Sequence, residues 1–107
     1  MITKGSNGLP VYELGFALEG MVDEFDDPIP PVTHVKFVRD YLTTDDLITV
    51  VEACGDVSKL ATDVSVQFKV VKALLPRMTT LTMEQVGIMR AKDFQALVQV
   101  MAPFLVI

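Results

Sequence analysis

The sequence predicts an α+β fold, mostly helical, in which an N-terminal β-ribbon precedes three or four packed helices. Apolar and polar residues alternate between Tyr12 and Leu18 and again between Val32 and Arg39, which is the period of half-buried strands. From residue 43 onward the pattern changes to helix caps and apolar spacings of three and four. Half of the 107 residues are hydrophobic, so residues 1–107 are expected to form a single domain with its own core.

The first third of the chain is predicted to form a ribbon of two antiparallel strands over residues 9–39. Residues 1–8 are expected to be a flexible start, since their glycines neither follow a strand nor open a helix as a phosphate loop does. Between the strands, acidic residues and prolines predict a long exposed loop, because proline removes a backbone donor. These residues are Asp23, Glu24, Asp26, Asp27, Pro28, Pro30 and Pro31.

Residues 43–103 are predicted to be helical, and the first helix has clear ends. Thr43 and Asp46 have the spacing of a capping box, and Gly55 is a typical C-terminal stop. The inner face of this helix is predicted to consist of Leu47, Val50, Val51 and Cys54.

The next predicted helix, residues 56–78, is apolar on two sides. Spacings of three and four draw one stripe through Leu60, Val64, Phe68, Val71, Leu75 and Met78. A second stripe lies almost opposite and consists of Val66, Val70 and Ala73, with Leu74 at its border. Such a helix either lies in the middle of a domain or offers one face to another chain. The sequence leaves both arrangements open.

Two shorter helices are expected after Pro76, which predicts a kink or an end near Leu75. Thr82 and Gln85 form another capping box, and the inward residues of that helix are predicted to be Met83, Val86 and Met89. An unbroken helix would place the Asp93 carboxylate on its apolar face, so the sequence predicts a break at residues 90–93. Asp93 is then expected to cap a last helix. The inner residues of the last helix are then Phe94, Leu97, Val98 and Met101.

The net charge of −5 is unevenly distributed along the chain. Residues 1–56 contain eleven acidic and three basic residues, whereas residues 57–107 contain three acidic and six basic residues. This acidic first half argues against nucleic acid as a partner, because phosphate binding requires concentrated Lys and Arg. No apolar run reaches the roughly 18 residues of a membrane helix. We therefore expect no membrane partner. Because no signal peptide is visible and the chain has a single cysteine, we expect a cytosolic protein.

No complete catalytic or metal-binding constellation is recognisable, so no enzyme activity, metal or cofactor is expected. The chain has one histidine, His34, and one cysteine, Cys54, whereas a structural Cys/His metal site needs about four ligands. A small enzyme using Cys54 and His34 as a nucleophile pair is an alternative, which requires the fold to bring the two together. The acidic loop is an alternative site for a hard cation, although its spacing is not that of an EF-hand.

The C-terminal two-thirds of the chain resembles a known family in its order of elements. The pattern consists of a strand ending in a basic residue (Val35 to Leu42), a short helix ending at Gly55, a longer helix with Phe68 to Leu75, then Leu81 to Val86 and Asp93 to Leu97. Over roughly residues 32–104 this pattern resembles the tail assembly chaperones of tailed bacteriophages and prophages, in particular the Mu-like group. The chain departs from the usual shape of the family in having Asp40 after Arg39 and a long loop from Gly20 to Pro31.

The resemblance implies a non-enzymatic protein of the host cytoplasm that binds the tape measure protein and the tail tube protein during tail morphogenesis. A chaperone of helical chains needs an apolar groove or stripe and adaptable contacts such as methionine. The residues expected to contact the partner are Val66, Val70, Ala73, Leu74, Met78, Met83 and Phe104. The alternative from another class is a self-associating virion subunit, for instance of a ring, that uses the same faces for homo-oligomer contacts.

Overall fold

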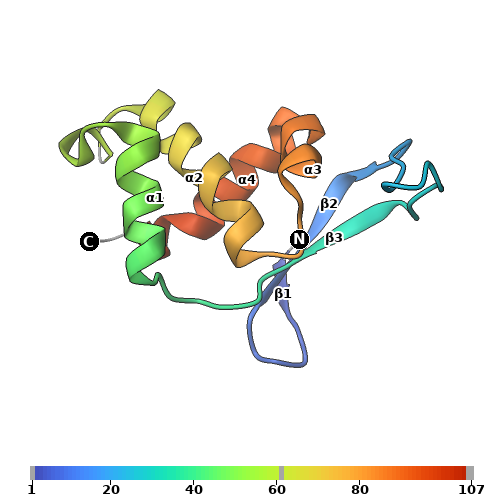
Figure 1. Ribbon diagram of the computed structural model, residues 1–107. Coiled ribbons are helices and arrows are strands. Elements are labelled where there is room, and N and C mark those ends of the chain that lie inside the picture. Colours follow the sequence, from blue (N-terminus) through green and yellow to red (C-terminus); the bar gives the residue numbers. More distant parts are fainter. Residues whose placement is uncertain (1, 61, 106–107) are drawn as a thin grey trace.

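The computed structural model describes residues 2–60 and 62–105, and it confirms the α+β class (Figure 1). Strands β1 (Ile2–Lys4), β2 (Pro10–Leu18) and β3 (Val32–Lys36) form an antiparallel sheet in the order β1-β2-β3. The remaining elements are α1 (Thr44–Cys54), the 3₁₀ turn η1 (Val57–Lys59), α2 (Val64–Met78), α3 (Met83–Ile88), α4 (Ala91–Met101) and the 3₁₀ turn η2 (Ala102–Leu105). The helices form one body, from which the β2–β3 ribbon projects.

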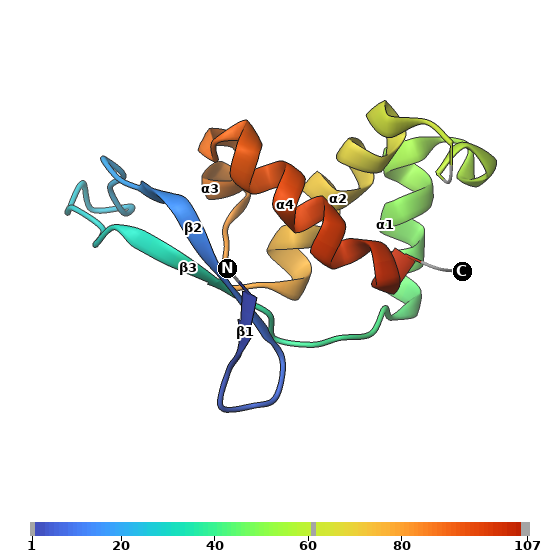
Figure 2. The ribbon, with the colours of Figure 1, turned by 180° about the vertical axis from the view of Figure 1, so that it is seen from behind.

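Helix α2 is the centre of the helical body and packs against α1, α3 and α4; in Figure 2, α4 crosses in front of α2 and α1 lies beside it. Residues of both predicted stripes are buried in one core: Val66, Val70, Val71, Leu74, Leu75 and Met78. Of the two arrangements that the sequence leaves open, the structure therefore has the helix in the middle of the domain. Residues of both stripes are covered because three helices, α1, α3 and α4, pack around α2.

Helix α2 is shorter than predicted, since it begins at Val64 and not near residue 56. The Asp63 carboxylate caps it by accepting hydrogen bonds from the Ser65 and Val66 amides at 3.0 and 3.4 Å. Leu60 is still buried, although it lies before the helix, whereas Val64 is exposed. Pro76 lies inside the helix, which continues to Met78.

The predicted flexible start is wrong for residues 2–4, which form β1 and pair with β2 in the register Ile2↔Tyr12. Gly5 to Gly8 make the turn between these strands. The Gly5 amide donates to the Leu9 carbonyl at 2.9 Å, and Gly8 has a φ of +78°, which glycine adopts readily. The period of two correctly predicts β2, but three residues are too few to show such a period for β1.

The sheet is joined to the end of α2 by backbone hydrogen bonds beyond β3. The Val38 amide donates to the Met78 carbonyl at 2.8 Å, and the Thr80 amide donates to the Lys36 carbonyl at 3.0 Å. These bonds flank the bridge between Phe37 and Thr79, and the Phe37 ring is buried. The segment after α2 thus continues the pairing of the sheet, which fixes the ribbon to the helical body.

Both predicted capping boxes and the Gly55 stop are confirmed, but the predicted role of Asp93 is wrong. Helix α4 begins at Ala91, and Arg90 precedes it without a side-chain cap bond. Asp93 lies in the first turn on the buried face, a place that the sequence pattern does not predict for a carboxylate. The inner residues Leu97, Val98 and Met101 are buried as predicted, and Phe94 is half-buried.

Asp93 is acceptable in the core because strand β2 supplies its hydrogen-bond partners. One carboxylate oxygen accepts from the Gly15 amide at 2.8 Å and from the Tyr12 hydroxyl at 3.2 Å, and the other accepts from the Phe16 amide at 3.2 Å. The two consecutive amides are free to bind Asp93 because the pairing of β2 with β3 shifts register between Glu13 and Leu18. Burial and the bond to Asp93 together raise the pKa of Tyr12.

We predict that Asp93→Ala lowers the free energy of unfolding by about 2–3 kcal/mol, because it leaves two amides of β2 without their acceptor. Urea denaturation followed by circular dichroism measures the loss. The control is Lys92→Ala, an exposed neighbour on the same helix that is expected to change stability by less than about 0.5 kcal/mol. Equal stability of the two variants would contradict this account of the link between β2 and α4.

Candidate functional site

Four of the seven predicted contact residues are core residues. Val66, Val70, Leu74 and Met78 are buried in α2, and Ala73 is half-buried. The prediction that this stripe is an exposed binding face is therefore wrong. The physical reason is the central place of α2, whose second face is covered by the chain's own helices. A charged substitution at Val70 would consequently test folding and not binding.

The other two predicted contact residues, Met83 and Phe104, lie in different environments. Met83 is the first residue of α3 and is 77% exposed, so its predicted inward orientation is wrong, whereas Val86 and Met89 are buried as predicted. The Phe104 ring is half-buried and packs edge-on against Phe37, with 5.8 Å between ring centroids. Of the predicted set, only Met83 is largely available to a partner.

The exposed apolar surface lies instead on α1. Leu47, Ile48 and Val51 are 40, 52 and 48% exposed, although Leu47 and Val51 were predicted to face inward. Val50 is buried and Cys54 is half-buried, as expected for inner positions. Because residues three and four apart are neighbours on a helix, the three exposed side chains form one continuous strip. We call Leu47, Ile48 and Val51 the α1 stripe.

The rotation of α1 that exposes this stripe is set by Asp46, whose side chain is completely buried. Its carboxylate is paired with Arg39 of the linker before α1 and with Arg77 near the end of α2, where the Arg77 Nε donates at 2.6 Å. The Thr43 amide adds a hydrogen bond at 2.8 Å. With Asp46 turned inward, Val50 one turn later faces the core, and Leu47, Ile48 and Val51 face outward.

Sequence reasoning missed this surface because it treated Asp46 only as part of the capping box. Arg39 and Arg77 could have indicated that Asp46 is a buried ion-pair partner, but their proximity to Asp46 depends on the packing of α1 against α2. The Arg39 guanidinium is the largest cause that holds the pKa of Asp46 far below its usual range, with Thr43 and Arg77 adding to it. The carboxylate is thus ionised although it is buried.

A second exposed apolar region lies on the projecting ribbon. Most of the loop after β2 is exposed as predicted, although Met21 is buried. The loop is ordered by Asp23, whose carboxylate accepts from the Phe25 amide at 2.8 Å and the Asp27 amide at 3.0 Å. Phe25 is 75% exposed at this turn, and Val22, which forms a bridge with Pro28 in the same loop, is also exposed. On β2, the Arg90 guanidinium lies over the exposed Phe16 ring, 5.0 Å from its centroid.

The structure does not bring His34 and Cys54 together. His34 lies in β3 with its Nδ1 2.8 Å from the Thr33 hydroxyl, whereas Cys54 is the last residue of α1. These two elements lie on opposite sides of the molecule in both ribbon views (Figures 1 and 2). Within residues 2–60 and 62–105, no three His, Cys, Asp or Glu side chains are grouped so as to hold a metal ion.

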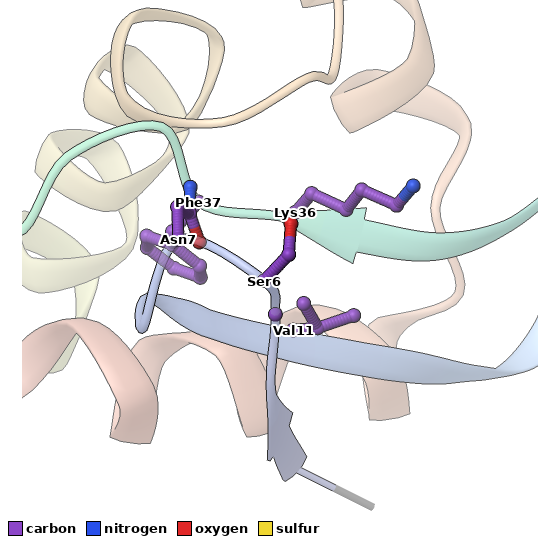
Figure 3. Close-up of a pocket in the computed structure, with 6 residues that line it drawn as sticks. Ser6, Asn7, Val11, Lys36 and Phe37 are labelled. Carbon is purple, nitrogen blue, oxygen red and sulfur yellow. The ribbon is translucent and has the colours of Figure 1, made fainter.

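A small open pocket lies at the turn between β1 and β2 (Figure 3). It is lined by Gly5, Ser6, Asn7, Val11, Lys36 and Phe37. In the close-up, the ammonium end of Lys36 points away from Ser6 and Asn7, so the charged group and the polar groups of the turn do not converge. The pocket therefore lacks the converging polar groups of a small-molecule site.

We predict that Asp46→Asn lowers the free energy of unfolding by about 3 kcal/mol at pH 7, because Arg39 and Arg77 lose the anion that they share. The difference from wild type should shrink as the pH falls below about 4, the ordinary carboxyl pKa. The sign follows from the lowered pKa of Asp46 in the folded protein. Ionised Asp46 stabilises the folded state fully above the ordinary carboxyl pKa, and this stabilisation is lost as the pH falls below that value and the unfolded chain takes up the proton first.

Urea denaturation at intervals from pH 7 to pH 2 measures this difference. The matched control is Asp45→Asn, which removes an exposed carboxylate from the neighbouring position and leaves the carboxylate that Arg39 and Arg77 share. A stability difference for Asp46→Asn that stays constant over the whole pH range would contradict the ionic role of this carboxylate.

Comparisons with protein-family models, with curated protein sequences and with solved structures found no match. Among the helices in the described part of the chain, none is long and apolar enough to cross a membrane.

Proposed function

We propose that this chain is a tail assembly chaperone of a tailed bacteriophage or prophage, which acts without enzymatic chemistry in the host cytoplasm. Its partners are the tape measure protein and the tail tube protein, which it keeps soluble until the tail is built. The family pattern in residues 32–104 suggests this function, and the exposed apolar side chains indicate how the chain can bind.

The observation that carries the proposal is the apolar surface outside the core, on α1 and on the projecting ribbon. Leu47, Ile48 and Val51 are neighbours on one helix face, and Phe25 stands exposed on an ordered turn. Contiguous exposed apolar residues with polar surroundings are typical of protein-binding sites, whereas scattered single residues are not. The net charge of −5 favours solubility of a complex that must cover the apolar surface of a partner.

This surface replaces the second stripe of α2 as the proposed contact region. Residues of that stripe are part of the core and support folding. Met83 remains exposed at the start of α3 and stays in the proposed contact set. Phe104 is partly covered by Phe37, so its contribution is confined to the exposed part of its ring.

The proposal predicts that co-expression with a tape measure protein of the same phage or prophage raises the soluble fraction of the tape measure protein several-fold. The two proteins should elute as one complex in size-exclusion chromatography with light scattering. Val51→Ser and Phe25→Ser each remove one exposed apolar side chain and are expected to weaken retention. Ile88→Ser, which removes a similarly exposed side chain from α3, is the matched control.

Failure to retain either the tape measure protein or the tail tube protein would contradict the proposal. A ring of fixed stoichiometry formed by the chain alone, and dependent on its concentration, would favour the self-associating virion subunit.

A further inference from the structure

The α1 stripe has acidic residues along one edge and no basic residue on its helix. Asp45 and Glu52 are exposed, and they lie three and four residues from Ile48, on the side of the helix away from the core positions Val50 and Cys54. Asp45 also lies in the first turn, where the helix dipole favours an acid, but Glu52 lies near the other end of the helix. The exposed face of α1 thus combines an apolar strip with an anionic border.

This charge pattern distinguishes among the partners that can cover the stripe. Antiparallel pairing of α1 with α1 of a second copy would place the acidic borders next to each other, and like charges at an interface oppose association. Parallel pairing would separate the borders but offer them no cation, because α1 has no basic residue. Anionic lipid headgroups and nucleic-acid phosphates would meet the same repulsion. A segment with Lys or Arg beside apolar residues complements both parts of the surface.

The size and shape of the stripe favour a helical segment. Helix α1 has 11 residues, which corresponds to a length of about 16 Å or three turns. An amphipathic helix lying along it can place apolar residues on Leu47, Ile48 and Val51 while its cations reach the border.

We infer that the α1 stripe is the docking site for an amphipathic helix of the partner, whose apolar face covers Leu47, Ile48 and Val51 and whose Lys or Arg residues pair with Asp45 and Glu52. This inference rests on the proposed function, since it assigns the chemistry of the segment that the chaperone holds. Asp46 supports the site indirectly, because its burial turns the stripe outward.

The test uses the full chain labelled with ¹⁵N and titrated with three synthetic helical peptides of equal length. The first carries an apolar Leu stripe bordered by Lys, the second the same Leu stripe bordered by Glu, and the third the Lys residues with Gln in place of Leu. Amide chemical shifts report which elements each peptide contacts. We expect the Leu/Lys peptide to perturb residues 44–54, and the other two peptides to bind about tenfold more weakly or not at all.

Substitutions then separate the apolar and the charged parts of the site. Ile48→Ser and Val51→Ser are expected to weaken binding of the Leu/Lys peptide about tenfold, and Glu52→Gln to weaken it less and to reduce its salt dependence. Ile88→Ser on α3 is the matched apolar control and should bind as wild type does. Unchanged amide shifts of the core in each variant confirm that the fold is retained.

The inference is overturned if the Leu/Lys peptide perturbs the ribbon and not α1, or if the Leu/Glu peptide binds equally well. It is also overturned if α1 shifts move with protein concentration in the absence of peptide, which would identify a second copy as the occupant. Retention of the tape measure protein together with an unperturbed α1 rejects this site but not the proposed function. Peptide binding at α1 without retention of either tail protein rejects the proposed function but not the chemistry of the site.

Discussion

Burial of α2 on both of its apolar faces is the constraint on which the rest of the structure depends. A helix that is apolar on two sides needs cover on both, and in this chain α1, α3 and α4 pack around α2 and supply it. The backbone bonds between Val38 and Met78 and between Thr80 and Lys36 then attach the sheet to the end of the same helix. Val35 of the sheet and Phe37, just beyond β3, belong to the core around α2, while most of the β2–β3 loop remains in solvent.

Two buried carboxylates determine how the outer elements are oriented around this centre. Asp46 is held by Arg39 and Arg77, which fixes the rotation of α1 and leaves the α1 stripe exposed. Asp93 accepts the amides of Gly15 and Phe16, which fixes β2 against α4. Because a buried polar group is stable only with its hydrogen-bond partners in place, each carboxyl group selects one orientation of its element. The exposed surface is therefore a consequence of polar contacts in the interior.

The helical signals were the most reliable part of the sequence analysis, because they depend on neighbouring residues. Thr43 with Asp46 and Thr82 with Gln85 form the predicted capping boxes, and Gly55 ends α1 with a φ of +71°. The predictions about faces were less reliable. Leu47, Val51 and Met83 have the spacing of inner residues but are exposed. The apolar pattern of a short helix is compatible with more than one rotation about the helix axis, and a single buried contact can determine which rotation is adopted. The strand β1 was missed because its pairing with β2, and not its own pattern, makes it a strand.

The sequence by itself determined the α+β class, the order of the ribbon and the helices, the capped ends of α1 and α3, and the uneven charge. These features arise from local chemistry, in which backbone geometry and neighbouring side chains suffice. Only the tertiary structure decided that Val66, Val70, Leu74 and Met78 belong to the core and that Leu47, Ile48 and Val51 do not. That choice depends on which elements meet, here through Asp46 and Asp93. Asp46 pairs with Arg77, 31 residues away in the chain, and Asp93 accepts from Gly15, 78 residues away.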